Sequence, residues 1–181
     1  MATLESSSEG QIQMMQSSTR VAAAIATSCV FAVVLVEADQ VRRTSPASSL
    51  VPLEVSLTVG ASTYTGKGQG SCTHAPKASI FGVLSEMWTV RHQDEGRSMQ
   101  LTLWKPADGS APMFNLSVSG KTTASISTVR GGQVTGSGTV TLAPSGKGGT
   151  FTIDAKGKTG EAIGGTIKCE AFTPAIAEGG N

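Results

Sequence analysis

The nine residues Val51–Val59, with the sequence VPLEVSLTV, decide the fold class of this chain. Apolar side chains occupy every second position, and Pro, Glu, Ser and Thr stand between them. A period of two places alternate side chains on opposite faces of a β-strand, whereas a helix needs a period of about 3.6 residues. The stretch therefore predicts a strand with one buried face and one solvated face.

Shorter stretches of the same kind follow, each bounded by turn residues. The expected strands are Ser62–Thr65, Ala78–Val83, Met87–His92, Ser98–Lys105, Met113–Ser119, Ala124–Val129, Thr139–Ala143, Thr150–Ala155 and Thr166–Phe172. The glycine-rich segments Gly66–Gly70 (GKGQG) and Pro144–Gly149 (PSGKGG) are expected to be turns with positive φ. We expect an all-β domain, an antiparallel β-sandwich or small barrel of about nine or ten short strands.

The composition of the 181-residue chain excludes several other classes of protein. Charged residues make up 15% and aromatic residues 4%, and serine and threonine are each about as frequent as the 22 glycines. A helical bundle or coiled coil would need far more Ala, Glu, Lys and Leu at helical spacing. The formal net charge of +1 argues against a nucleic-acid partner.

The longest apolar run, Val21–Val36, lies near the N-terminus and directly follows Arg20. As a helix it would be about 24 Å long, shorter than a hydrocarbon core of about 30 Å. Small residues at Val36 and Ala38 match a signal peptidase site, so we expect residues 1–38 to be a secretory signal peptide with a signal helix, cleaved after Ala38.

The residues before this run are acidic, at Glu5 and Glu9, whereas a signal sequence normally begins with a basic segment. A start at Met14 or Met15 would give a better signal, and we expect one of these to be the true start. Two alternatives remain open for the apolar run. It could stay uncleaved as a membrane anchor, or the chain could be cleaved before Cys29 and lipidated there.

The rest of the chain divides by composition into three parts. Residues 39–50 are polar and predict a linker, residues 51–173 predict the β domain, and residues 174–181 predict a C-terminal tail. The polar linker and the single alternating region indicate one domain at this length.

Two cysteines, Cys72 and Cys169, remain after the expected cleavage. An even number in an exported domain favours a disulfide, and a disulfide favours the periplasm, the cell envelope or the extracellular space. The alternative is a zinc site in which His74 and His92 join the two cysteines. The close Cys-x-x-Cys spacing of zinc modules is missing, so no metal site is expected.

No catalytic residue can be assigned from the sequence. There is no G-x-S-x-G nucleophile motif, and neither glycine-rich segment matches a dinucleotide or phosphate-binding loop, so no cofactor is expected. The carboxylates are scattered. The sequence favours a non-enzymatic protein and leaves open a small hydrolase that uses carboxylates or His74.

The aromatic residues give the one indication of a binding surface. Leu101 and Leu103 share one face of their expected strand, and Trp104 lies on the opposite face, which is expected to be solvated. An exposed Trp on a threonine-rich sheet can stack on a sugar or anchor a protein partner. Trp104 is therefore a candidate contact, and Trp88, Tyr64 and His74 are the others. The alternative is that Trp104 packs under a loop or lies on a strand that is buried on both sides.

The segment Gly136–Cys169 (GSGTVTLAPSGKGGTFTIDAKGKTGEAIGGTIKC) combines glycine, an alternating strand, a hairpin, a second strand and a closing cysteine. In this it resembles small bacterial exported antigen-type β domains, such as the mycobacterial lipoprotein antigens with one disulfide. The resemblance covers about a quarter of the expected mature chain, and the leader lacks a clear lipobox. It implies an envelope location and no defined enzymatic activity.

Together these observations predict an exported, non-enzymatic bacterial β domain of the periplasm or cell envelope. We expect it to bind an envelope protein or a glycan. The alternatives are a small secreted or periplasmic hydrolase, and a structural accessory subunit of an envelope assembly whose exposed strand edges pair with neighbours. Contact with a membrane is expected only through the N-terminal segment.

Overall fold

The structure is a computed structural model that describes residues 49–175. Within these residues the chain is all-β, with ten strands and no helix, as the sequence predicts. The expected signal helix, its cleavage site, Cys29 and the last six residues lie outside the described residues. The strands are β1 (Val51–Val59), β2 (Ser62–Ile80), β3 (Val83–Asp94), β4 (Arg97–Pro106), β5 (Met113–Ser119), β6 (Ala124–Ser127), β7 (Gly136–Ser145), β8 (Gly148–Gly157), β9 (Ala162–Cys169) and β10 (Thr173–Pro174).

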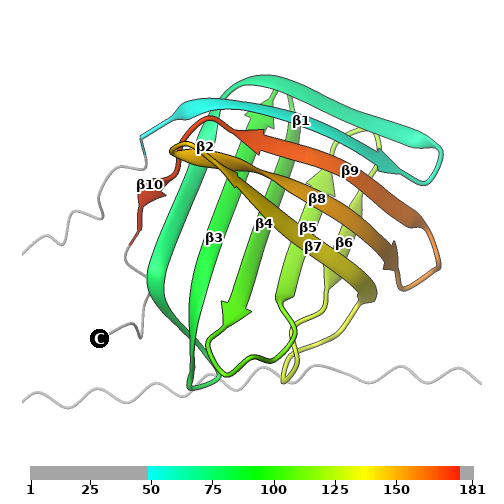
Figure 1. Ribbon diagram of the computed structural model, residues 1–181. Helices are drawn as coiled ribbons and strands as arrows, with labels where there is room; N and C mark the ends of the chain where they lie inside the picture. Colours follow the sequence, from blue (N-terminus) through cyan, green and yellow to red (C-terminus); the bar gives the residue numbers. More distant parts are fainter. Residues whose placement is uncertain (1–48, 176–181) are drawn as a thin grey trace, which may run out of the picture. The chain divides into compact units, whose positions relative to one another are not determined.

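The strands form one antiparallel sheet that nearly closes into a barrel, with the order β6-β5-β4-β3-β2-β1-β9-β8-β7. In Figure 1, β1, β9, β8 and β7 cross in front of β3, β4, β5 and β6. At the seam, the backbone N–H of Thr135 donates to the carbonyl of Ser127 at 2.9 Å. The short strand β10 pairs in parallel with β2, beside Thr73 and His74. Of the two architectures expected, the described part of the chain is therefore the barrel-like one.

Strand β2 belongs to both halves of this sheet. Ser62–Gly70 pairs with β1, and Ser71–Ile80 pairs with β3, so the strand changes partner at Gly70. A Cβ on Gly70 would lie 2.2 Å from the Leu53 side chain and 2.6 Å from the carbonyl of Arg91. Only glycine lets β1, β2 and β3 approach this closely, which allows the bend that is visible at the top and left of Figure 1.

The GKGQG segment is therefore part of a strand, and the expectation of a turn there is wrong. Gly66 and Gly68 lie in the ladder with β1, and neither has a positive φ. These glycines make room for neighbouring atoms instead of reversing the chain. The PSGKGG segment is a hairpin turn as expected, with φ of 59° at Gly146 between β7 and β8. A turn at Phe81 also divides the expected strand Ala78–Val83.

The interior of the barrel is filled by aliphatic and phenyl side chains. The five inward side chains of β1 are all buried, as the alternation of VPLEVSLTV predicts. The largest side chains that are fully buried are Phe114, Phe151, Leu57, Met99, Leu101, Leu116, Ile126, Ile163 and Ile167. Burial of this apolar surface is the main force that holds the two halves of the sheet together.

Cross-strand rows of hydroxyl groups cover the outside and explain the excess of serine and threonine. On one outer face, five exposed residues stand side by side on neighbouring strands: Thr65, Ser56, Thr166, Thr152 and Thr141. Threonine suits a solvated strand because its β-branched side chain favours the extended backbone.

The disulfide expected from the sequence joins Cys72 of β2 to Cys169 of β9, which are 97 residues apart. Both cysteines are buried. Their oxidation leaves no thiolate for the zinc site considered above. A structural disulfide of this kind is consistent with an oxidising compartment.

Candidate functional site

The sheet opens between β2 and β3 on the N-terminal side of Ser71, where the two strands do not pair. The last pair of the β2–β3 ladder at this end is Ser71 with Arg91, so His92 has no partner on β2. Tyr64 and His92 point into the resulting gap, and the Tyr64 hydroxyl lies 2.9 Å from Nδ1 of His92. A Cβ on Gly66 would lie 2.2 Å from the His92 ring, so the glycine makes the space that this ring occupies.

Next to this pair, three contacts hold the Arg97 side chain in place. It donates a 2.8 Å hydrogen bond to the Asp94 carboxylate across the β3–β4 turn. Its central carbon lies 5.5 Å from the centre of the Tyr64 ring, within the range of a cation–π contact. The stem of Arg97 packs against Gly120, where an added Cβ would lie 2.9 Å from it. The cation is therefore positioned before any ligand arrives.

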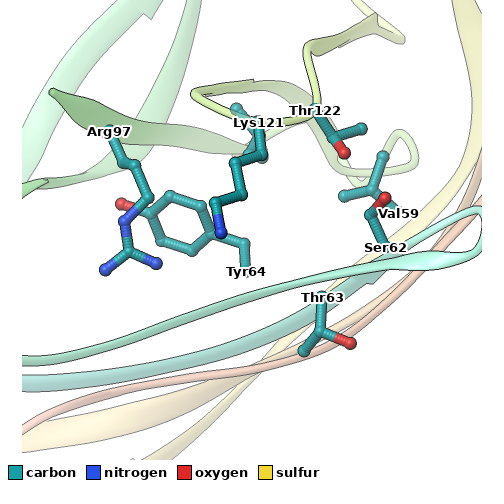
Figure 2. Close-up of a pocket in the computed structure, with 8 residues that line it drawn as sticks. Val59, Ser62, Thr63, Tyr64, Arg97, Lys121 and Thr122 are labelled. Carbon is teal, nitrogen blue, oxygen red and sulfur yellow. The ribbon is translucent and has the colours of Figure 1, made fainter.

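Arg97, Tyr64 and Lys121 line a pocket of about 210 Å³ at this end of the barrel (Figure 2). In Figure 2 the Lys121 side chain extends over the Tyr64 ring, with the Arg97 guanidinium on the other side. The remaining wall contains the hydroxyl groups of Ser62 and Thr122, two valines, Val59 and Val118, and Thr63, whose side chain points away from the cavity in Figure 2. The pocket thus combines two cations with hydroxyl groups.

Burial keeps both members of the Tyr64–His92 pair uncharged near neutral pH. Desolvation raises the pKa of Tyr64, and the nearby Arg97 only partly offsets this. Desolvation likewise lowers the pKa of His92 from its ordinary value of 6.5. The 2.9 Å contact is then a hydrogen bond between two neutral groups, and the tautomer of His92 sets which of them donates.

This electrostatic arrangement is suited to binding an anion. General-base catalysis or attack by the phenol would require His92 or Tyr64 to change charge near neutral pH, and burial opposes both changes. Arg97 and Lys121 offer positive charge on the wall of the pocket, and Arg97 is paired with Asp94. A carboxylate or phosphate group matches such donors well.

Of the four candidate contacts from the sequence, only Tyr64 lines this pocket. The structure brings His74 and Trp88 together elsewhere, with stacked rings 4.7 Å apart. Nε2 of His74 lies 3.6 Å from the Glu86 carboxylate. Trp88 is itself buried in the core.

Trp104 is not on an open solvated face. It is partly buried against a small second cluster that consists of Ile80, Met113 and Val129. The parity argument missed this because Val129 comes from the β6–β7 connection, which the alternation within β4 cannot reveal.

Sequence reasoning missed Arg97 and Lys121 as site residues. Both lie at turns, at the start of β4 and after β5, and the topology alone brings these turns to the same end of the barrel. The available signal was weak: a basic residue follows a turn glycine in both Gly96-Arg97 and Gly120-Lys121.

No protein family model, curated protein or solved structure matches this chain. Among residues 49–175, no three His, Cys, Asp or Glu side chains gather as a metal-binding set. The same residues include no helix of the length and apolarity that a membrane crossing requires. The site is therefore interpreted from its own geometry.

Proposed function

We propose that this chain is an exported, non-enzymatic binding domain of the bacterial periplasm or cell envelope. Its ligand is an anionic unit of an envelope glycan, which is held in the pocket of Arg97, Tyr64 and Lys121. The observation that carries the proposal is the fixed position of Arg97, held by Asp94, Tyr64 and Gly120 on the wall of a pocket that also presents hydroxyl groups.

The size and lining of the pocket support a single acidic sugar unit. A volume of about 210 Å³ is below the range of about 300–1,000 Å³ typical of sites for whole drug-sized ligands. Hydroxyl groups of Ser62 and Thr122 can exchange hydrogen bonds with sugar hydroxyls. The carboxylate or phosphate of the sugar would pair with Arg97 and Lys121.

Two further features support an exported location. The Cys72–Cys169 disulfide fits an oxidising compartment. The signal-like segment at residues 1–38 and the resemblance of Gly136–Cys169 to exported antigen-type domains agree with it. Residues 1–38 lie outside the described residues, so this part of the proposal depends on sequence.

A hydrolase receives less support than a binding domain. The neutral, buried Tyr64–His92 pair is poorly placed to move a proton. His74, the other candidate base, contacts the Trp88 indole and the Glu86 carboxylate, and neither is a nucleophile of the serine or cysteine type.

Isothermal titration calorimetry with N-acetylmuramic acid, glucuronic acid and neutral N-acetylglucosamine tests the proposal. We expect an acidic sugar to bind and the neutral sugar to bind at least about tenfold more weakly, which corresponds to about 1.4 kcal/mol for the lost ion pairs. Lys121→Ala should weaken acidic-sugar binding by a similar factor, because it removes one cation from the pocket.

Lys156→Ala is the matched control, since Lys156 is an exposed lysine of β8 outside the pocket lining. Equal binding of acidic and neutral sugars, or equal loss in both lysine variants, would contradict the proposal. Failure of every acidic sugar to bind would also contradict it.

A further inference from the structure

The turn between β2 and β3 holds a phenylalanine in an unfavourable backbone conformation. Phe81 has φ of 50° and Gly82 has φ of 78°, so the two-residue turn requires positive φ at both positions. Such turns strongly prefer Asn, Asp or Gly at the first position, since a bulky side chain is strained there. Glu95, with φ of 39°, occupies the same position of the β3–β4 turn, so the apolar and exposed side chain of Phe81, and not the strain alone, is the reason to look for a function.

The side chain of Phe81 is also exposed, with 65% of its surface accessible, and Leu84 close by is 60% exposed. One edge of the Phe81 ring approaches Gly131 of the β6–β7 connection, where a Cβ would lie 3.4 Å from it. A bulky apolar side chain in this position does not stabilise the turn and is largely in water. Its placement is explained if it contacts a ligand.

A pocket of about 360 Å³ lies beside Phe81. The connections β2–β3, β4–β5 and β6–β7, which contribute to it, lie together at the lower edge of Figure 1. Its lining includes Ile80 and Met113, which are buried members of the second apolar cluster, together with Phe81 and Pro106. Trp104 packs against the same cluster. The volume is within the lower part of the range for small-molecule sites.

Arg130 is the residue of this pocket that can bind an anionic group. Its guanidinium donates a long hydrogen bond of 3.5 Å to the Ala111 carbonyl. A guanidinium has five N–H donors, so Arg130 can still bind a carboxylate. The Asp108 carboxylate already accepts a 2.9 Å hydrogen bond from the Ser110 backbone N–H within its own loop. Asp108 would repel an anionic ligand at short range.

We propose that this end of the barrel binds a single amphiphilic anion, with its short alkyl chain or aromatic ring against Phe81, Ile80 and Met113 and its carboxylate at Arg130. The site differs from the proposed glycan pocket in its residues, which combine Ile80, Phe81 and Met113 with a single cation, Arg130. Its occupant is a single free molecule, because a pocket of about 360 Å³ accommodates one short tail beside Phe81.

Trp104 provides an intrinsic reporter, because it packs on the cluster that contributes to the lining of the pocket. Tryptophan fluorescence is recorded during titration with octanoate, decanoate and 3-phenylpropionate below any micelle concentration, and calorimetry measures the same binding. We expect a saturable change that is absent in Trp104→Phe. Phe81→Asn should weaken binding at least about tenfold while it raises the midpoint of urea unfolding, because Asn tolerates positive φ.

Charge variants test the position of the carboxylate. Arg130→Gln should weaken octanoate binding about tenfold, and Asp108→Asn should strengthen it. Neither should change the binding of octanol, which has the same tail without the charge. Unchanged octanol binding by both charge variants also shows that they are folded.

Three results would overturn the proposal. The first is the absence of any saturable response to the three carboxylates. The second is an unchanged affinity in Phe81→Asn, or a lower urea midpoint for it, which would make Phe81 a structural residue. The third is binding to phosphatidylglycerol vesicles with no binding of the monomeric carboxylates, which would identify a membrane contact instead.

Discussion

The hydroxyl of Tyr64 lies 2.9 Å from Nδ1 of His92 and connects β2 to β3 where these strands no longer pair. Both side chains are buried, with 5% and 4% of their surfaces exposed. The bond thus satisfies two polar groups inside an otherwise apolar region, and the Tyr64 ring is part of the wall of the proposed glycan pocket. The stability of this end of the barrel should therefore depend on the charge of His92.

Acidification should destabilise the protein through His92. The pKa of His92 is lowered in the folded state by burial, so the unfolded chain binds the proton more readily. Stability from this residue is fully present above the ordinary pKa of 6.5 and is lost as the pH falls from there toward the lower folded value. Urea unfolding at a series of pH values measures the effect.

His92→Gln is the variant to compare with the wild type in that series, since the amide cannot titrate. The wild type should lose more stability than the variant between pH 7 and pH 5, a window whose lower end is about 1.5 units below the ordinary histidine pKa. Parallel curves for the two proteins would show that His92 does not carry the pH dependence.

The glycines of β2 provide a matched pair of substitutions. Gly66→Ala would place a Cβ 2.2 Å from the His92 ring, so the ring must move and the bond to Tyr64 is lost. We expect a loss of about 1–3 kcal/mol of unfolding free energy. Gly68→Ala, two residues along the same strand, meets no atom within 4 Å and should be neutral or stabilising by up to about 1 kcal/mol. Chemical denaturation of both variants compares them, and equal losses would contradict the close approach at Gly66.

Removal of the disulfide should cost much of the stability of the domain. The bridge closes a loop of 97 residues, for which the chain-entropy model gives about 4–5 kcal/mol. The double variant Cys72→Ala/Cys169→Ala should therefore unfold at a much lower urea concentration than the oxidised wild type. Reduced wild-type protein is the control, and a wild type that is equally stable with and without reductant would contradict a structural role.

Export can be tested by N-terminal sequencing of the mature protein isolated from cells. Cleavage after Ala38 predicts that the mature chain begins at Asp39. A mature chain that begins at Cys29 would identify the lipoprotein alternative instead. A chain that retains Val21–Val36 would support the uncleaved anchor.

The strand pattern was predictable wherever one face of a strand is buried and the other is solvated. VPLEVSLTV keeps this alternation over its whole length, and the structure buries the expected face. GKGQG was misinterpreted because glycine serves both turns and close strand contacts, and only the three-dimensional structure brings His92 against Gly66. A local pattern cannot report a contact between residues that lie far apart in sequence.

The candidate site was less predictable than the fold for the same reason. Tyr64 could be named from the sequence, but its partners His92 and Arg97 come from β3 and β4, and Lys121 follows β5. Arg97 and Lys121 lie at turns, where the sequence has no alternation that could indicate which way a side chain points. The disulfide was the exception, because in an exported domain with two remaining cysteines the pairing follows from the count alone.

The most direct test of the glycan pocket is a ¹H–¹⁵N NMR titration of the domain with N-acetylmuramic acid and glucuronic acid. We predict chemical-shift changes that concentrate at Ser62–Tyr64, Arg97 and Lys121–Thr122, saturate with ligand, and disappear in Lys121→Ala but not in Lys156→Ala. Shift changes that are absent for both sugars, or that map to the exposed hydroxyl row of Thr65, Ser56 and Thr166, would contradict the assignment of this pocket as the binding site.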